Sequence, residues 1–146
     1  MTLVKQLLRS KGSEVVTVTP DTSVYDALQT MAEKNIGALV VVEEDEVVGI
    51  ISERDYARKV ILQGKTSIKV PVQDIMTERV YFVYPENTIE QCMALMTDKR
   101  VRHLPVLEND KLAGIVSIGD AVKVIISNQE FIIEQLENYI VGGGHV

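Results

Sequence analysis

The segments Gly49-Ile50-Ile51-Ser52-Glu53-Arg54-Asp55 and Gly114-Ile115-Val116-Ser117-Ile118-Gly119-Asp120 share one pattern: glycine, two apolar residues, serine, two residues and aspartate. They lie 65 positions apart. When the chain is shifted by that distance, residues 15 to 61 align with residues 80 to 126 without a gap, and 14 of the 47 pairs are identical. A gapless match of this length predicts that the chain contains an internal duplication.

The two copies predict the same order of elements: a strand, a helix, a hairpin of two strands and a second helix. In the first copy these elements are expected at Val15–Val18, Val24–Lys34, Ala38–Val42, Val47–Ile51 and Ser52–Leu62. In the second copy they are expected at Val80–Val83, Thr88–Asp98, His103–Leu107, Leu112–Val116 and from Ser117 onward. The continuous apolar run of the first hairpin strand is typical of a strand covered on both faces.

The flanking segments complete the predicted organisation. We expect an N-terminal helix, a first repeat, a linker with its lead-in, a second repeat, and a C-terminal helix with a tail, at residues 1–12, 13–64, 65–78, 79–127 and 128–146. The last helix is expected to continue after a break near Ser127-Asn128. The glycine-rich tail from Gly142, which includes His145, is expected to fray.

Composition restricts the class of protein. The chain has 146 residues and a net charge of -6, which disfavours nucleic acid and anionic membranes as partners. It holds no apolar run near the roughly 20 residues that cross a bilayer. The N-terminus lacks the pattern of a signal peptide. The single cysteine, Cys92, indicates a buried thiol in a reducing compartment, so we expect a cytoplasmic protein.

The serine and the aspartate of the repeated pattern allow two interpretations. Each serine stands where a strand passes into a helix, and helix N-termini favour phosphate because their unpaired N–H groups carry partial positive charge. The hydroxyl can donate to a phosphate oxygen, and the aspartate can accept hydrogen bonds from a ribose diol. The same pair also forms a capping box, which stabilises a helix start without a ligand. The two interpretations are compatible.

With these motifs the chain resembles the CBS domain family, named after cystathionine β-synthase, as a tandem pair often called a Bateman module. The resemblance rests on the paired Ser-x-x-Asp segments, on Asn35-Ile36-Gly37-Ala38-Leu39-Val40 and on Arg100-Val101-Arg102-His103-Leu104-Pro105-Val106. It covers nearly the whole chain. It implies an α+β fold in which two β-α-β-β-α repeats pack pseudo-symmetrically, with adenosine ligands in the cleft between them.

The resemblance implies two sites, each with a phosphate-binding serine, a ribose-binding aspartate and residues around the base. One site would use Ser117, Asp120, Val16, Gly37 and Ala38. The other would use Ser52, Asp55, Tyr81, Arg102 and His103. Gly37 and Ala38 leave room for an adenine ring, whereas the matching Arg102 and His103 are bulky, so the two sites are not equivalent.

Cationic residues indicate where phosphate would bind. We expect phosphate contacts from Arg100 and Arg102 and, with less support from the motif, from Arg54 and Lys99. The alternative is a solvated helix end, since basic residues favour helix C-termini. Arg58 is expected to be a surface charge.

No motif for a nucleophile, a phosphate-binding loop or a metal cluster is present, so we expect neither an enzyme nor a bound metal. The predicted function is a stand-alone regulatory module that senses AMP, ADP, ATP or NAD(H) and acts through a downstream protein that the sequence does not name. The alternative is a structural or oligomerisation module with vestigial nucleotide sites. The apolar stripe of the C-terminal helix, which exceeds the needs of one core, predicts a homodimer.

Overall fold

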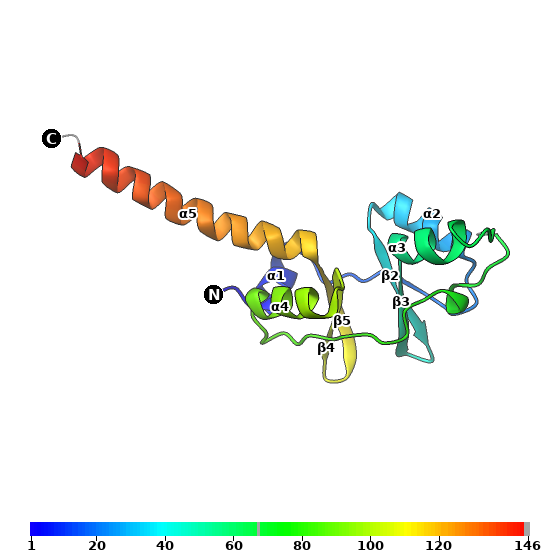
Figure 1. Cartoon of the computed structure of the whole chain (residues 1–146). Helices are drawn as coiled ribbons and strands as arrows, with labels where there is room; N and C mark the ends of the chain where they lie inside the picture. The colour runs from blue at the N-terminus through cyan, green and yellow to red at the C-terminus, as the bar shows by residue number, and fades with distance from the viewer. Residues whose placement is uncertain (67, 145–146) are drawn as a thin grey trace.

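The computed structural model describes residues 1–66 and 68–144, so the prediction for His145 lies outside the described residues. Two groups of strands and short helices lie side by side, and one long helix leaves the second group (Figure 1). The helices are α1 (Val4–Lys11), α2 (Val24–Lys34), α3 (Glu53–Tyr56), α4 (Ile89–Lys99) and α5 (Ile118–Gly144), and the strands are β1 (Thr17–Val18), β2 (Ala38–Glu43), β3 (Glu46–Ser52), β4 (His103–Glu108) and β5 (Lys111–Ser117). The predicted α+β fold with two repeats is confirmed.

The first repeat, residues 15–61, is built on a three-stranded sheet in the order β1-β2-β3. Strand β2 runs parallel to β1 and antiparallel to β3, with Val40 opposite Ile50. The first four residues of β2 are buried, as the apolar run predicted. The hairpin turn places Glu44 and Asp45 at positive φ, 52° and 65°, which is the turn geometry that matches the twist of two antiparallel strands.

The second repeat, residues 80–126, keeps only the hairpin β4-β5, and the predicted strand at Val80–Val83 is wrong. Val83 alone bridges to β4, donating to the Pro105 carbonyl at 3.1 Å and accepting from the Leu107 N–H at 3.0 Å. Pro105 stands where the first repeat has Val40, whose N–H donates to the Val16 carbonyl at 3.4 Å. Proline has no N–H to donate, so the ladder cannot extend beyond this bridge.

Equivalent side chains cap the long helix of each repeat. Ser23 accepts a hydrogen bond from the Asp26 N–H at the start of α2, and Thr88 accepts one from the Gln91 N–H at the start of α4. Each of these helices ends at a left-handed residue, Asn35 or Arg100. Such caps satisfy backbone groups that a helix end leaves unpaired, so both helices hold the same place over their sheets.

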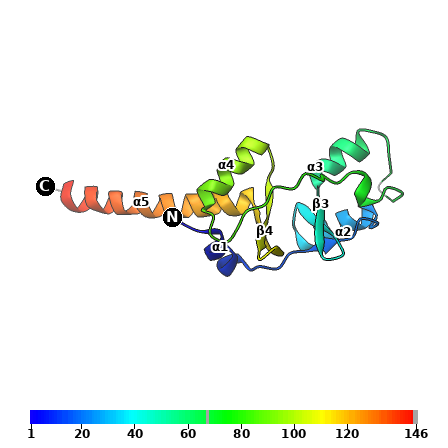
Figure 2. The ribbon, with the colours of Figure 1, turned by 90° about the horizontal axis from the view of Figure 1, so that it is seen from below.

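Each repeat is completed by a segment that precedes the other repeat in the chain. The Val4 N–H donates to the Asn87 carbonyl at 2.8 Å, and the Val72 N–H donates to the Thr22 carbonyl, at the equivalent position, at 2.7 Å. Helix α1 therefore packs on the second repeat, beside α4 (Figures 1 and 2), and the 3-10 turn Val72–Asp74 packs on the first. Two hydrophobic cores result, one in each repeat.

Helix α5 runs without interruption from Ile118 to Gly144, so the predicted break near Ser127-Asn128 is wrong. Neither residue is a glycine or a proline, and each leaves the backbone hydrogen bonds of a helix intact. The first turns of α5 pack on the second repeat through the buried Ala121, and the rest projects away from the body (Figure 2). Within the described residues, no helix has both the length and the apolar character needed to cross a membrane.

Candidate functional site

A cavity of about 710 Å³ lies between the two repeats. It is within the size range of small-molecule sites. The first repeat contributes the end of β3 and the start of α3, and the second contributes Tyr81 and the segment between α4 and β4. The lining residues are Gly37, Ile50, Ser52, Glu53, Arg54, Asp55, Arg58, Lys59, Thr77, Arg79, Val80, Tyr81, Lys99, Arg100, Val101, Arg102 and His103.

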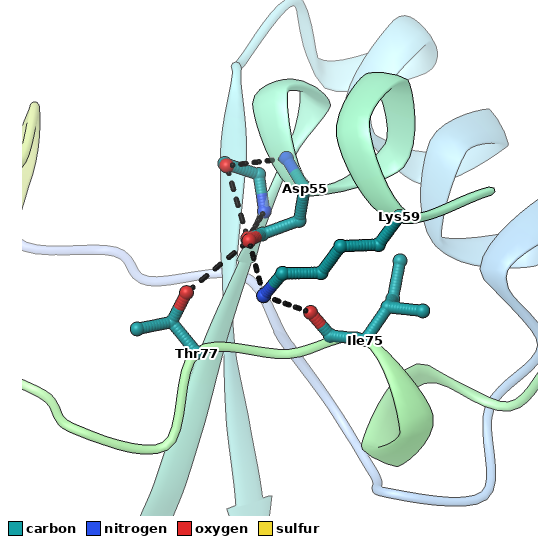
Figure 3. Close-up of polar contacts among 5 residues, drawn as sticks. Asp55, Lys59, Ile75 and Thr77 are labelled. Carbon is teal, nitrogen blue, oxygen red and sulfur yellow. Dashed lines mark hydrogen bonds and ion pairs between the residues drawn. The ribbon is translucent and has the colours of Figure 1, made fainter. Parts of the chain in front are cut away.

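The Asp55 carboxylate has donors on both oxygens (Figure 3). Its Oδ2 accepts from the Ser52 N–H at 3.0 Å and from the Ser52 hydroxyl at 3.1 Å. Its Oδ1 accepts from the Thr77 hydroxyl at 3.2 Å and pairs with the Lys59 ammonium at 3.1 Å. The Ser52 hydroxyl also accepts from the Asp55 N–H at 3.2 Å, which completes the capping box of α3. The aspartate is thus a helix cap at the wall of the cavity.

Positive charge is concentrated around this cavity. Seven of its lining residues are lysine or arginine and two are carboxylates, in a chain whose net charge is -6. The Arg54 guanidinium donates to the Arg100 carbonyl at 3.3 Å and so links the two repeats. The Lys99 ammonium lies 5.5 Å from the centre of the Tyr81 ring, within the range of a cation–π contact.

His103 and Gly37 meet at the boundary between the repeats. A Cβ placed on Gly37 would lie 3.7 Å from Nε2 of His103, an ordinary contact distance. Burial lowers the pKa of His103 below its ordinary value; Asp120 opposes this shift, and Lys11 and Arg102 add to it. His103 is therefore neutral near pH 7 and adds no charge to the surrounding arginines.

Asp120, the equivalent of Asp55, has a different partner. Its Oδ2 accepts from the Ser117 N–H at 2.9 Å and pairs with the Lys11 ammonium at 2.6 Å. Burial alone would raise the pKa of Asp120, but hydrogen bonds from Lys11 and Ser117 hold it below its ordinary value. Lysine reaches Asp55 from one turn along the same helical segment, whereas the residue equivalent to Lys59 is Val124, and the lysine at Asp120 comes from α1.

The cavity brings together nine of the thirteen predicted site residues: Gly37, Ser52, Arg54, Asp55, Tyr81, Lys99, Arg100, Arg102 and His103. Four others do not line it. Ser117 and Asp120 form the second capping box, Val16 packs against the core of the first repeat, and Ala38 is buried in β2. Binding by any of these residues stays a prediction.

Sequence reasoning missed Lys59, Thr77 and Arg79, and it assigned Arg58, which also lines the cavity, to the open surface. Lys59 stands four residues after Asp55, a spacing that places two side chains on one helix face and could have been used. Thr77 and Arg79 follow the lead-in segment Val72-Gln73-Asp74-Ile75-Met76. That segment matches Val4-Lys5-Gln6-Leu7-Leu8 at a separation of 68 residues, a signal that the 65-residue shift hides.

The two repeats, their completing segments and the cleft between them identify the class of protein. The family model of the CBS domain matches residues 4–62 and 72–127. The chain therefore belongs to the CBS domain family and carries two CBS domains in tandem.

Individual relatives agree with this assignment. The chain is 42% identical over 151 residues to CBSX3, a mitochondrial CBS domain-containing protein of Arabidopsis thaliana, and the match covers 97% of this chain and 73% of that protein. It is 52% identical to the structure of a proposed signal-transduction protein with CBS domains from Burkholderia ambifaria, with a TM-score of 0.85 over 88% of this chain and 96% of that one.

A third similar structure contains ligands. It is the CBS domain pair of protein MJ0100 in complex with 5-methylthioadenosine and S-adenosyl-L-methionine. This chain is 26% identical to it, with a TM-score of 0.77 over 88% of this chain and 98% of that one.

Proposed function

We propose that this CBS pair is a regulatory module that binds an adenosine nucleotide in the cleft at Asp55. One observation carries the proposal: a single cavity is lined by a serine and an aspartate from one repeat and by an aromatic ring and several cations from the other. These groups match the parts of a nucleotide, which are a flat base, a sugar diol and an anionic phosphate. The similar pair that holds two adenosine compounds supports the choice of adenosine.

The contacts of Asp55 determine how a ribose would bind. A carboxylate offers about four acceptor positions, and four protein donors already contact this one. The two bonds from Ser52 hold the cap of α3. A ribose hydroxyl would therefore replace the Thr77 hydroxyl or the Lys59 ammonium on Oδ1. Lys59 also donates to the Ile75 carbonyl at 2.9 Å and would keep that bond (Figure 3).

The charge of the cleft favours ligands that carry phosphate. Seven cationic side chains against two carboxylates leave a strong positive field, and burial of part of this surface strengthens its attraction for anions. Guanidinium groups suit phosphate because they donate two parallel hydrogen bonds. We therefore expect AMP, ADP, ATP or NAD(H) to bind more tightly than adenosine or S-adenosylmethionine.

A ligand in this position would contact both repeats. Few direct polar contacts join the repeats across the cleft, and the bond from Arg54 to the Arg100 carbonyl is one of them. A phosphate that attracts Arg54 would compete with that bond and shift how the repeats sit together. Such a shift is the physical basis for a regulatory role exerted on a partner protein.

The proposal is tested by thermal unfolding with AMP, ADP, ATP, NAD(H), adenosine and S-adenosylmethionine. A ligand that binds only the folded state adds about 2.7 kcal/mol of stability at a hundredfold excess over Kd. We expect at least one phosphate-bearing ligand to raise the Tm and adenosine to raise it less. If no compound raises the Tm at millimolar concentration, the chain is better described as a structural module.

Two substitutions separate binding from capping. Asp55→Ala and Asp120→Ala remove equivalent hydrogen bonds from equivalent capping boxes, and each should cost about 1 kcal/mol of stability. Only Asp55 lines the cleft. We expect Asp55→Ala to abolish the ligand-induced rise in Tm and Asp120→Ala to retain it. Equal retention in both variants would contradict a ribose contact at Asp55.

A further inference from the structure

The distal part of α5 carries a wide apolar face that nothing in the described chain covers. Every residue from Ile126 to Ile140 is exposed, and Ile133, Leu136 and Ile140 are 53%, 56% and 65% exposed. Figures 1 and 2 both show this part of the helix extending away from the two repeats. Contiguous apolar surface of this kind marks an interaction site.

The spacing of the apolar residues indicates what covers the face. Residues recur at alternating steps of four and three, the spacing of a coiled-coil seam: Val122, Ile126, Gln129, Ile133, Leu136 and Ile140. The positions beside this seam on one flank are Ile125, Ile132 and Tyr139, and those on the other flank are Lys123, Glu130 and Glu137. A seam with this period fits a second helix of the same period.

The seam is complementary to itself when two copies of α5 run antiparallel. Val122 of one copy then faces Ile140 of the other, Ile126 faces Leu136, and Gln129 faces Ile133, so that every seam residue has a partner. On the apolar flank Ile132 meets its own counterpart. On the charged flank Lys123 lies beside Glu137 of the other copy, twice by symmetry, against a single contact between the two Glu130 side chains. A parallel pair would instead set Ile132 beside Glu137.

The charges also argue against a lipid surface as the occupant. Beyond Lys123 the described helix carries Glu130, Glu134 and Glu137 and no lysine or arginine. Anionic lipid surfaces attract helices whose polar face is rich in cations. We propose that α5 forms an antiparallel two-helix coiled coil with α5 of a second copy of this chain, which joins two CBS pairs into a homodimer.

The first test is a matched pair of substitutions read out by light scattering and sedimentation. Ile133→Asp places a charge in the centre of the seam, and Phe131→Asp places the same charge on the opposite side of the same helical turn. We expect a dimer for the unchanged chain and for Phe131→Asp, and a monomer for Ile133→Asp. A monomeric unchanged chain at high micromolar concentration would overturn the proposal, and so would an equal response of the two variants.

The second test addresses the antiparallel arrangement. Lys123→Glu or Glu137→Lys alone would set like charges side by side and raise the dimer dissociation constant severalfold. The double variant K123E/E137K restores opposite charges and should regain the affinity of the unchanged chain. Absence of this rescue would contradict the antiparallel pairing. These readouts contain no nucleotide, so their outcome is independent of ligand binding in the cleft.

Discussion

Asp55 and Asp120 occupy equivalent positions in the two repeats, and their surroundings give them different chemistry. Both accept a hydrogen bond from the N–H of the serine three residues earlier, so the capping interpretation holds for both. Asp55 lies at the wall of a cavity with Thr77 and Lys59, whereas Asp120 is paired with Lys11. Capping and ligand binding are thus separable at the level of single residues.

The pair of Lys11 and Asp120 should stabilise the fold by about 1 kcal/mol, since both side chains are partly buried but still reached by water. Lys11→Met should lower the free energy of unfolding at pH 7 by that amount. The pKa of Asp120 is lowered in the folded chain, so the contribution is full above its ordinary value of 3.8 and is lost as the pH falls through the folded value.

Urea denaturation at pH 7 and at several values below pH 4 measures this effect. Lys5→Met, on an exposed position of the same helix, is the matched control and should change stability little. A difference between the unchanged chain and Lys11→Met that grows as the pH falls would contradict the assignment.

Cys92 provides a second prediction for a single residue. Its side chain is fully buried in the core of the second repeat, and burial raises the pKa of its thiol to about 11. The thiolate is the reactive species, so iodoacetamide at pH 8 should modify the folded chain very slowly and the chain in urea rapidly. The measurement is mass spectrometry over time. Rapid modification of the folded chain would contradict the burial of this side chain.

At the scale of elements, the repeat and its helical and strand periods predicted α2, α4 and both hairpins closely. Two features depended on the partner of a segment rather than on its own residues. The segment Val80–Val83 has the composition of a strand, but Pro105 on the neighbouring strand lacks the N–H that pairing requires. The crossing of α1 and Val72–Asp74 to opposite repeats was not predicted, because the lead-ins follow a different separation.

The lead-ins approach the hairpins so closely that two glycines are required. A Cβ on Gly49 would lie 2.6 Å from Sδ of Met76 and 3.1 Å from the Thr77 carbonyl, and one on Gly114 would lie 2.7 Å from a Leu8 methyl group. Gly49→Ala and Gly114→Ala should each destabilise the chain by about 1–3 kcal/mol through overpacking.

Chemical denaturation provides the measurement for these variants, and Gly119→Ala provides the control. Gly119 lies inside α5, and its added Cβ would meet only the Ser117 hydroxyl at 3.7 Å. Alanine favours a helix over glycine, so this variant should be neutral or more stable. A neutral result for Gly49→Ala and Gly114→Ala would contradict the close packing of the lead-ins.

At the scale of the whole molecule, the sequence predicted most residues of the Asp55 cleft, because the motif and the family resemblance located them on both repeats. It could not predict that the two halves differ so much. That difference arises from Lys11, which reaches Asp120 only because α1 packs on the second repeat, and from Thr77, which reaches Asp55 because its lead-in packs on the first. Contacts between segments distant in the chain decide both.

The most direct test of nucleotide binding at Asp55 is calorimetric titration of ATP into the unchanged chain and into Asp55→Ala and Asp120→Ala. We expect one ATP for each unchanged chain, the same stoichiometry for Asp120→Ala, and no measurable heat of binding for a folded Asp55→Ala. Binding that persists in Asp55→Ala but disappears in Asp120→Ala would contradict the account and assign the nucleotide to the other half of the molecule.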